Sequence, residues 1–176
     1  MQSGIITFAV YEDGSEYMGL AKCTLPDVSH KTATISGAGL AGDIEVPMTG
    51  QTEAMSMTID FIDNPPAAYR LSEPGVHTLD LRVPHNDLDP VSCSLRVRGY
   101  KHIVKVMPKT LKGGEIAPAA TQGVSTDYTC IYRADYIDGK RKLLIDKLNN
   151  KYCGEDGVDL FEPVNAALGK PVTNRV

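Results

Sequence analysis

Alternation of apolar and polar side chains is the strongest pattern along this chain. Apolar residues recur at every second position in the stretches 55–61, 79–83, 91–97 and 128–136. This is the period of a strand that buries one face. Gly99 interrupts the third stretch and the apolar residues resume out of phase, so we expect a bulge or bend within one long strand there.

Three Asp-Gly pairs mark the turns between these runs. Asp138-Gly139 and Asp13-Gly14 each lie between two strand-like runs, and Asp-Gly tolerates the positive φ angles of a type I′ turn. We therefore predict a hairpin at each of these two positions. Asp156-Gly157 predicts a third turn near the C-terminal end.

Helical signals are scarce. Asn64 is placed to cap a short helix that continues through Pro65 to Leu71. A second short helix is predicted at 161–168, with Gly169 as its C-cap. We predict a mainly β fold, a β-sandwich or small barrel with one or two short flanking helices. Residues 1–169 would form a single domain and residues 170–176 a loose tail.

Composition narrows the function classes. The 176 residues are 42% hydrophobic and 23% charged, which is typical of a globular chain. The net charge of −4 lacks the basic surplus of a protein that grips nucleic acid by its phosphates. Aromatic residues make up 6% and tryptophan is absent, which argues against a stacking platform for bases. We see no membrane-spanning run and no secretory signal.

Candidate metal and catalytic motifs are weak. Cys23, Cys93, Cys130 and Cys153 are widely spaced, and the histidines form no closely spaced pairs, so we expect reduced, partly buried thiols rather than a zinc site. The loop 85–89 misses the EF-hand pattern and is interpreted as a polar loop. We predict no catalytic residue, no metal site and no cofactor.

The glycine-rich segment 37–42 matches the G-x-G-x-x-G dinucleotide fingerprint. That fingerprint requires a helix N-terminus directly after the glycines. The segment continues instead as Asp43-Ile44-Glu45-Val46-Pro47, which alternates polar and apolar residues, and Asp43 would repel a phosphate. We predict extended chain here and reject a nucleotide site.

The basic run Lys140-Arg141-Lys142 follows the Asp138-Gly139 turn. We favour an edge strand that charge protects from uncontrolled pairing, and a contact with an acidic partner remains open. A β chain without a visible active site has strand edges to satisfy. Pairing with copies of itself is one way to satisfy them.

Several stretches together resemble the major tail tube protein family of contractile-tailed bacteriophages and related R-type bacteriocins. The similarity extends from about Ile5 to Gly169 and rests on the order and spacing of its parts. The matching stretches are 31–47, 53–61, 74–82, 136–149, 157–159 and 166–169.

The resemblance implies a structural role without enzymatic activity. Subunits would form hexameric rings that stack into a tube, and inner strands of six subunits would join into one β-barrel around the lumen. A long loop would reach a neighbouring ring, where small residues allow backbones to approach closely. The implied inter-subunit contact residues are Gly37, Gly39, Leu40, Gly42, Asp43, Ile44, Val46 and Pro47.

The resemblance also implies the partners. They are further copies of the chain, the tail sheath protein, and the tape measure, tube-initiating and tube-terminating proteins. DNA would pass through the lumen without specific binding, and no membrane would be involved. The protein would be part of the virion tail, assembled in the host bacterial cytoplasm. The alternatives are a monomeric β-barrel ligand-binding module and an enzyme on a β scaffold.

Overall fold

The computed structural model describes residues 2–17, 19–37, 39 and 41–170. Apart from Lys170, the predicted tail 170–176 lies outside the described residues. The described chain is mainly β, which confirms the predicted fold class. Its elements in chain order are β1 (Gln2–Ile5), β2 (Ala9–Glu12), β3 (Ser15–Tyr17), β4 (Leu20–Thr24), β5 (His30–Ile35), β6 (Ile44–Thr52), β7 (Met55–Phe61), α1 (Pro66–Leu71), β8 (His77–Leu88), β9 (Leu95–Lys112), β10 (Ser125–Ile137), β11 (Lys140–Asp146), β12 (Lys151–Cys153) and α2 (Glu162–Ala167).

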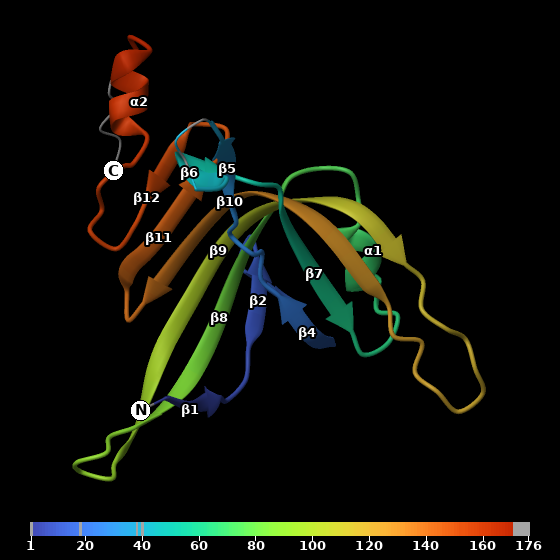
Figure 1. Ribbon diagram of the computed structural model, residues 1–176. Helices are drawn as coiled ribbons and strands as arrows, with labels where there is room; N and C mark the ends of the chain where they lie inside the picture. Colours follow the sequence, from blue (N-terminus) through green and yellow to red (C-terminus); the bar gives the residue numbers. More distant parts are fainter. Residues whose placement is uncertain (1, 18, 38, 40, 171–176) are drawn as a thin grey trace.

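One large antiparallel sheet dominates the molecule (Figure 1). Its strands follow the order β12-β11-β10-β9-β8-β2-β3, and β1 pairs with β8. The sheet forks at β10. The first half of β10 pairs with β7, which in turn pairs with β4, whereas the second half pairs with β11. β9 pairs with β10 along both halves.

A bulge at Ile131 lies at this fork. Cys130 pairs with Val106 and Tyr132 pairs with the adjacent Lys105, so Ile131 is an extra residue in β10. Neighbouring side chains of a strand point to opposite faces. The bulge therefore transfers the even-numbered side chains of β10 from one face of the sheet to the other.

The first face carries the main core. There the sheet curls into an open barrel, because its end strands β3 and β4 are separated in sequence only by residues 18–19. β7 alternates buried and more exposed residues along its whole length, as predicted. α1 contributes Ala68 and Leu71. The largest fully buried side chains are Tyr128, Met55, Met57, Ile59, Leu71, Leu79, Leu81, Val10, Val104, Val106, Val124 and Thr126.

A second, smaller core lies on the opposite face, beyond the bulge. Ala134, Leu144 and Cys153 are buried there, and Ile103 and the tyrosines of late β10 pack against them. The five alternating positions predicted from Tyr128 to Tyr136 are thus divided between two cores. The sequence pattern does not reveal this division, because apolar residues continue at every second position across the bulge.

The Asp-Gly turns are confirmed. Asp138 and Gly139 have φ angles of 49° and 77° between β10 and β11, and Asp13 and Gly14 have 48° and 80° between β2 and β3. These are the positive values that a type I′ hairpin turn requires. Gly157 also lies in a turn, with its N–H bonded to the carbonyl oxygen of Gly154 at 3.2 Å.

The predicted strand at 91–97 is wrong in its first half. β8 ends at Leu88 and β9 begins at Leu95, and a turn joins them. Asp89 holds this turn, because its carboxylate accepts the Val91 N–H at 3.0 Å and the Ser92 hydroxyl at 2.7 Å. The local hydrogen-bonding capacity of Asp89 overrides the alternation of apolar residues.

The bulge expected at Gly99 is also misplaced. Pairing of β8 with β9 runs without a register shift from His77↔Val106 to Leu88↔Leu95. The phase change has another cause: the apolar residues before Gly99 lie on the face opposite to Val104 and remain exposed. The bulges lie against β10, at Lys109 and Ile131.

The two helices lie where the sequence predicts them, but their capping residues differ from the predicted ones. α2 lies within the predicted range, but its C-cap is Leu168 rather than Gly169, which follows with a φ of 68°. Asn64 does not cap α1, whose N-cap is Pro65. The Asn64 amide donates instead to the Tyr69 hydroxyl at 2.9 Å. No helix of the described chain has the length and apolar character needed to cross a membrane.

All four cysteines are free thiols. Cys130 and Cys153 are buried and Cys23 is half-buried, in line with the prediction. Burial raises the pKa of Cys130 to about 11 and that of Cys23 to about 12. Cys93 departs from the prediction, because it is exposed in the turn between β8 and β9.

Candidate assembly interface

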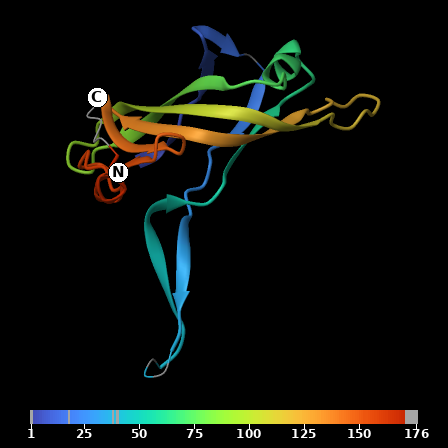
Figure 2. The same ribbon diagram turned by 90° about the horizontal axis from the view of Figure 1, so that it is seen from above.

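A two-stranded arm projects from the body of the molecule (Figure 2). The arm consists of residues 30–52, with β5 and β6 paired antiparallel and the glycine-rich segment at its tip. β6 begins two residues after Gly42, which confirms the extended chain predicted there. The dinucleotide interpretation therefore lacks the helix that it requires.

The arm has one apolar face. Cross-strand partners share a face. Ile35 pairs with Ile44 and Ala33 pairs with Val46, so these four residues form the apolar arm face. Ile35 is 51% exposed and Ile44 is 50% exposed, although both are large aliphatic side chains. An exposed apolar stripe on a projecting element is typical of an interaction surface.

The opposite face of the arm is polar. It carries the pairs Thr34↔Glu45 and Thr32↔Pro47. Asp43 and Glu45 are the only charged side chains between residues 32 and 52, and both are exposed. The outer part of the arm is therefore acidic on one side and aliphatic on the other.

The predicted contact residues fall in three places. Gly37, Gly39, Gly42 and Asp43 lie at the exposed tip, whereas Leu40 lies outside the described residues. Ile44 and Val46 lie on the apolar arm face and Pro47 lies on the polar face. A Cβ atom at Gly37, Gly39 or Gly42 would meet nothing within 4 Å in this chain. Packing within the subunit thus does not explain these glycines.

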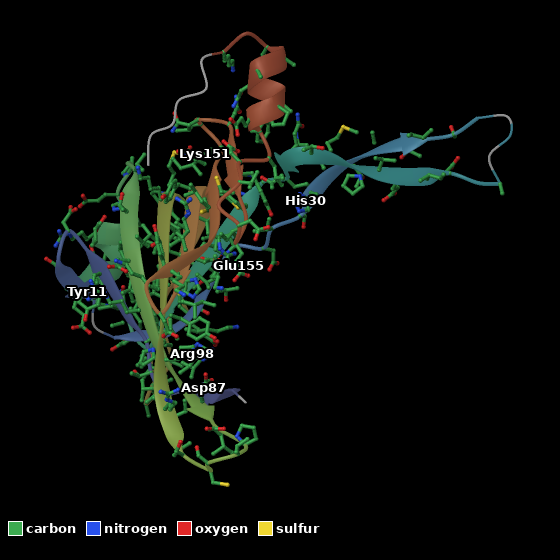
Figure 3. The ribbon with its side chains drawn as sticks, turned by 90° about the vertical axis from the view of Figure 1, so that its left-hand side faces the viewer. Tyr11, His30, Asp87, Arg98, Lys151 and Glu155 are labelled. Atoms are coloured by element: carbon green, nitrogen blue, oxygen red, sulfur yellow. The ribbon has the colours of Figure 1, made fainter. Side chains whose placement is uncertain are left out.

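Hydrogen bonds tie the root of the arm, where Figure 3 labels His30, to the β11 branch of the fork. The N–H of Glu53 bonds to the carbonyl oxygen of Ser29 at 2.8 Å. Lys147, just after β11, donates to the carbonyl oxygen of Glu53, and Arg133 of β10 donates to that of Pro26. Burial lowers the pKa of Lys147. The root is therefore fixed, whereas every described residue of the tip is exposed.

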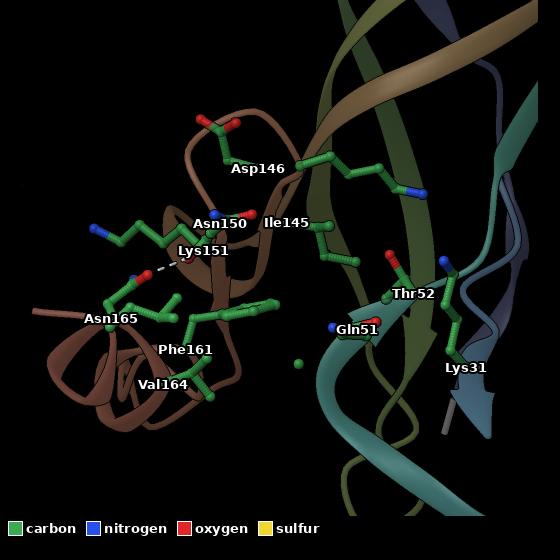
Figure 4. Close-up of a pocket in the computed structure, with 13 residues that line it drawn as sticks. Lys31, Gln51, Thr52, Ile145, Asp146, Asn150, Lys151, Phe161, Val164 and Asn165 are labelled. Atoms are coloured by element: carbon green, nitrogen blue, oxygen red, sulfur yellow. Dashed lines mark hydrogen bonds between the residues drawn. The ribbon is translucent and has the colours of Figure 1, made fainter. Parts of the chain in front are cut away.

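A cleft separates the arm root from α2 (Figure 4). We call it the root cleft, and its volume is about 290 Å³. Gly50 of β6 is buried beside it with a φ of 70°, and a Cβ atom there would lie 2.7 Å from the ring of Phe161. The lining residues are Lys31, Gly50, Gln51, Thr52, Ile145, Asp146, Lys147, Asn150, Lys151, Phe161, Val164, Asn165 and Leu168.

Sequence reasoning missed the root cleft. One signal was present: Phe161, Val164 and Leu168 are spaced as the apolar face of a short helix. The other wall comes from the arm root, more than a hundred residues earlier in the chain. No local pattern could have shown that the two walls face each other.

Two polar clusters elsewhere serve packing. Glu12 accepts hydrogen bonds from the Tyr17 hydroxyl and from His77. Burial of Tyr17 and, to a smaller extent, its hydrogen bond to Glu12 raise the pKa of Tyr17 to about 12. Asp135 accepts hydrogen bonds from His102 and Arg133. Within the described part of the chain, no three His, Cys, Asp or Glu side chains are grouped as metal ligands.

Comparison with known proteins identifies the family. The family model of phage tail tube protein FII matches residues 2–169. A chain of the cryo-EM sheath–tube complex of an extracellular contractile injection system (PVC), in its extended state, is 14% identical with a TM-score of 0.46, over 74% of this chain and 85% of that one. A comparison with curated proteins finds no match. Because the family model spans almost the whole sequence, this chain belongs to the phage tail tube protein FII family.

Proposed function

We propose that the chain is the structural subunit of a contractile tail tube, which self-assembles into stacked hexameric rings and forms a conduit for DNA or effectors. The observation that carries the proposal is the exposed apolar arm face in a member of a tail tube family. Exposing Ile35 and Ile44 to water is unfavourable, and a neighbouring subunit would remove that cost.

Strand edges supply a second contact. Of the residues of β11, only Leu144–Asp146 pair with β12, so within the described chain the segment 140–143 lies on an edge of the sheet. This confirms the edge position predicted for the basic run. Lys142 forms an ion pair with Glu155. Edges such as this one are the places where strands of adjacent subunits would join into a continuous barrel.

A ligand-binding barrel is less well supported. Its function would need a cavity inside the curled sheet. The interior is filled by fully buried side chains, among them Tyr128, Met57 and Leu79. Side chains that fill a small barrel in this way take the space that a ligand inside it would need.

The charge of the chain suits a conduit. A net charge of −4 disfavours retention of phosphates, so DNA would pass through the lumen without specific binding. We further propose that the tube contacts the tail sheath protein on its outside and the tape measure, tube-initiating and tube-terminating proteins along its length. The site of action would be the virion tail, after assembly in the host cytoplasm.

Negative-stain electron microscopy of the purified chain at high protein concentration tests this proposal. We expect rings and tubes without any added partner. A chain that sediments as a monomer at every concentration and removes small ligands from solution would show that the ligand-binding alternative is correct.

A further inference from the structure

The two walls of the root cleft differ in chemistry. Phe161 and Val164 line the wall on the α2 side, and Lys31, Gln51 and Thr52 line the opposite wall (Figure 4). A volume of about 290 Å³ is just below the range of ~300–1,000 Å³ that small-molecule sites occupy. The root cleft is thus large enough to receive a few side chains of a polypeptide.

Positive charge predominates around the root cleft. Lys31, Lys147 and Lys151 line it, against a single carboxylate from Asp146. That carboxylate accepts the backbone N–H groups of Leu148 and Asn149, both at 3.1 Å, and is thus engaged in its own turn. Within the described chain, neither Lys31 nor Lys147 forms an ion pair with a carboxylate. An acidic segment would complement this charge.

The outer arm has the matching chemistry. Asp43 and Glu45 are its only charged side chains, and Ile44 stands between them. Because strand neighbours point to opposite faces, Ile44 and Glu45 present an apolar side and an acidic side at once. A segment with those two sides fits a cleft with one apolar wall and one basic wall.

We propose that the root cleft receives the segment Asp43–Glu45 from the arm of a second copy of this chain. Ile44 would pack against Phe161 and Val164, and the acidic side chains would face the lysines. This inference rests on the proposed tube function and specifies the partner of the arm.

The occupant must come from another copy. The arm projects away from its own root, and its six-residue strand β5 is roughly 20 Å long at about 3.3 Å per residue. The tip therefore cannot fold back into the cleft beside its own base. A contact between tip and root is head-to-tail, and such a contact repeats from copy to copy until it closes a ring or extends a stack.

Charge reversal on each side tests the pairing. The arm variant carries Asp43→Lys and Glu45→Lys, and the cleft variant carries Lys31→Glu and Lys151→Glu. Each alone should raise the protein concentration needed for tube formation by more than about tenfold, because like charges then face each other. A 1:1 mixture of the two variants should form tubes again, since each arm meets a cleft of opposite charge. Circular dichroism establishes that each variant is folded.

A disulfide between copies gives a test that does not depend on charge. In a Cys93→Ser background, Ile44→Cys with Val164→Cys should yield covalent dimers and higher multimers in oxidised tubes. The matched control is Thr34→Cys with Val164→Cys, because Thr34 lies at a similar height on the opposite arm face. The control should yield at least about tenfold less cross-linked product, since a disulfide needs Cα atoms within about 7 Å.

The outcomes separate this inference from the proposed function. Tubes from the parent chain together with unimpaired assembly of both charge variants would overturn the docking proposal and leave the tube function intact. No tubes from the parent chain would overturn the tube function itself. A third experiment compares thiol labelling of monomeric Val164→Cys with and without truncation after Lys170. If truncation makes the cysteine accessible to the label, the chain's own C-terminal residues occupy the cleft and the proposal is wrong.

Discussion

At the scale of single residues, the contact between Gly50 and Phe161 fixes the arm root against α2. Gly50 combines a left-handed backbone conformation with an aromatic ring where its Cβ would lie. Only glycine satisfies both conditions without strain. This pairing sets the width of the root cleft.

Gly50→Ala should therefore lower the free energy of unfolding. A non-glycine residue in the left-handed region costs about 1–2 kcal/mol, and displacement of Phe161 adds to that cost. Urea unfolding of the unassembled chain measures the change. Gly37→Ala is the control, because its Cβ would meet nothing and its φ is not positive. Equal stability of the two variants would contradict the contact.

Asp135 is the residue for which pH should matter most clearly. Burial raises its pKa, but hydrogen bonds from His102 and Arg133 outweigh burial and hold the pKa below the ordinary value of 3.8. A carboxyl group with a lowered native pKa stabilises the fold above its unfolded pKa. That contribution is lost as the pH falls below 3.8 and through the native pKa.

Asp135→Asn should destabilise the chain by about 1.5–3 kcal/mol near pH 7, because two charge-assisted hydrogen bonds are weakened. The difference from the parent chain should shrink steadily below pH 4. Thermal unfolding of both proteins between pH 3 and pH 7 measures it. A difference that stays constant over this range would show that the ionised carboxylate is not the stabilising form.

At the scale of elements, the bulge at Ile131 divides the interior into two cores. Met57 and Tyr128 are cross-strand partners in the main core, whereas Leu144 belongs to the second core. The effects of two substitutions on the free energy of unfolding are coupled when the residues share a packing site, and they are additive when the residues lie in separate cores.

Double-mutant cycles should reveal this division. Met57→Ala combined with Tyr128→Leu should deviate from additivity by more than about 0.5 kcal/mol in the free energy of unfolding. Met57→Ala combined with Leu144→Ala should be additive within about 0.5 kcal/mol. Chemical denaturation of the single and double variants provides the values. Strong coupling between Met57 and Leu144 would mean that the two clusters form one core.

The elements that sequence predicted well are those set by local chemistry. The Asp138-Gly139 turn follows from two adjacent residues, and β7 follows from its own alternation. The bulge at Ile131 depends on how β10 pairs with β9, so the alternation of residues within β10 could not reveal the bulge. The turn at Asp89 was missed because apolar residues happened to continue the period through it.

At the scale of the whole molecule, body and arm are separable. Every residue described between 39 and 45 is exposed, so this segment contributes little to the core. Sequence resemblance located the arm, whereas the cleft that we propose as its partner brings together residues from both ends of the chain. Only the folded molecule shows that juxtaposition.

Deletion of residues 38–45 should leave a folded subunit that no longer stacks. Ala33 and Val46 could still pair across the four remaining residues, a normal hairpin length. The melting temperature of the monomer should change by less than about 4 °C, since every described residue that is lost is exposed. Electron microscopy should show no long tubes. Long tubes from the deletion variant would exclude the arm as the contact between rings.

The double attachment of the arm root has a mechanical consequence. A pull on the arm reaches the body at two anchors, Arg133 to Pro26 on β10 and Lys147 to Glu53 just beyond β11. Both anchors lie on the β11 branch of the fork, whereas the chain of the arm itself continues into β4 and β7 on the other branch, so the load divides between the two branches. Force transmitted from one subunit to the next would thus be spread through the sheet instead of peeling away a single strand.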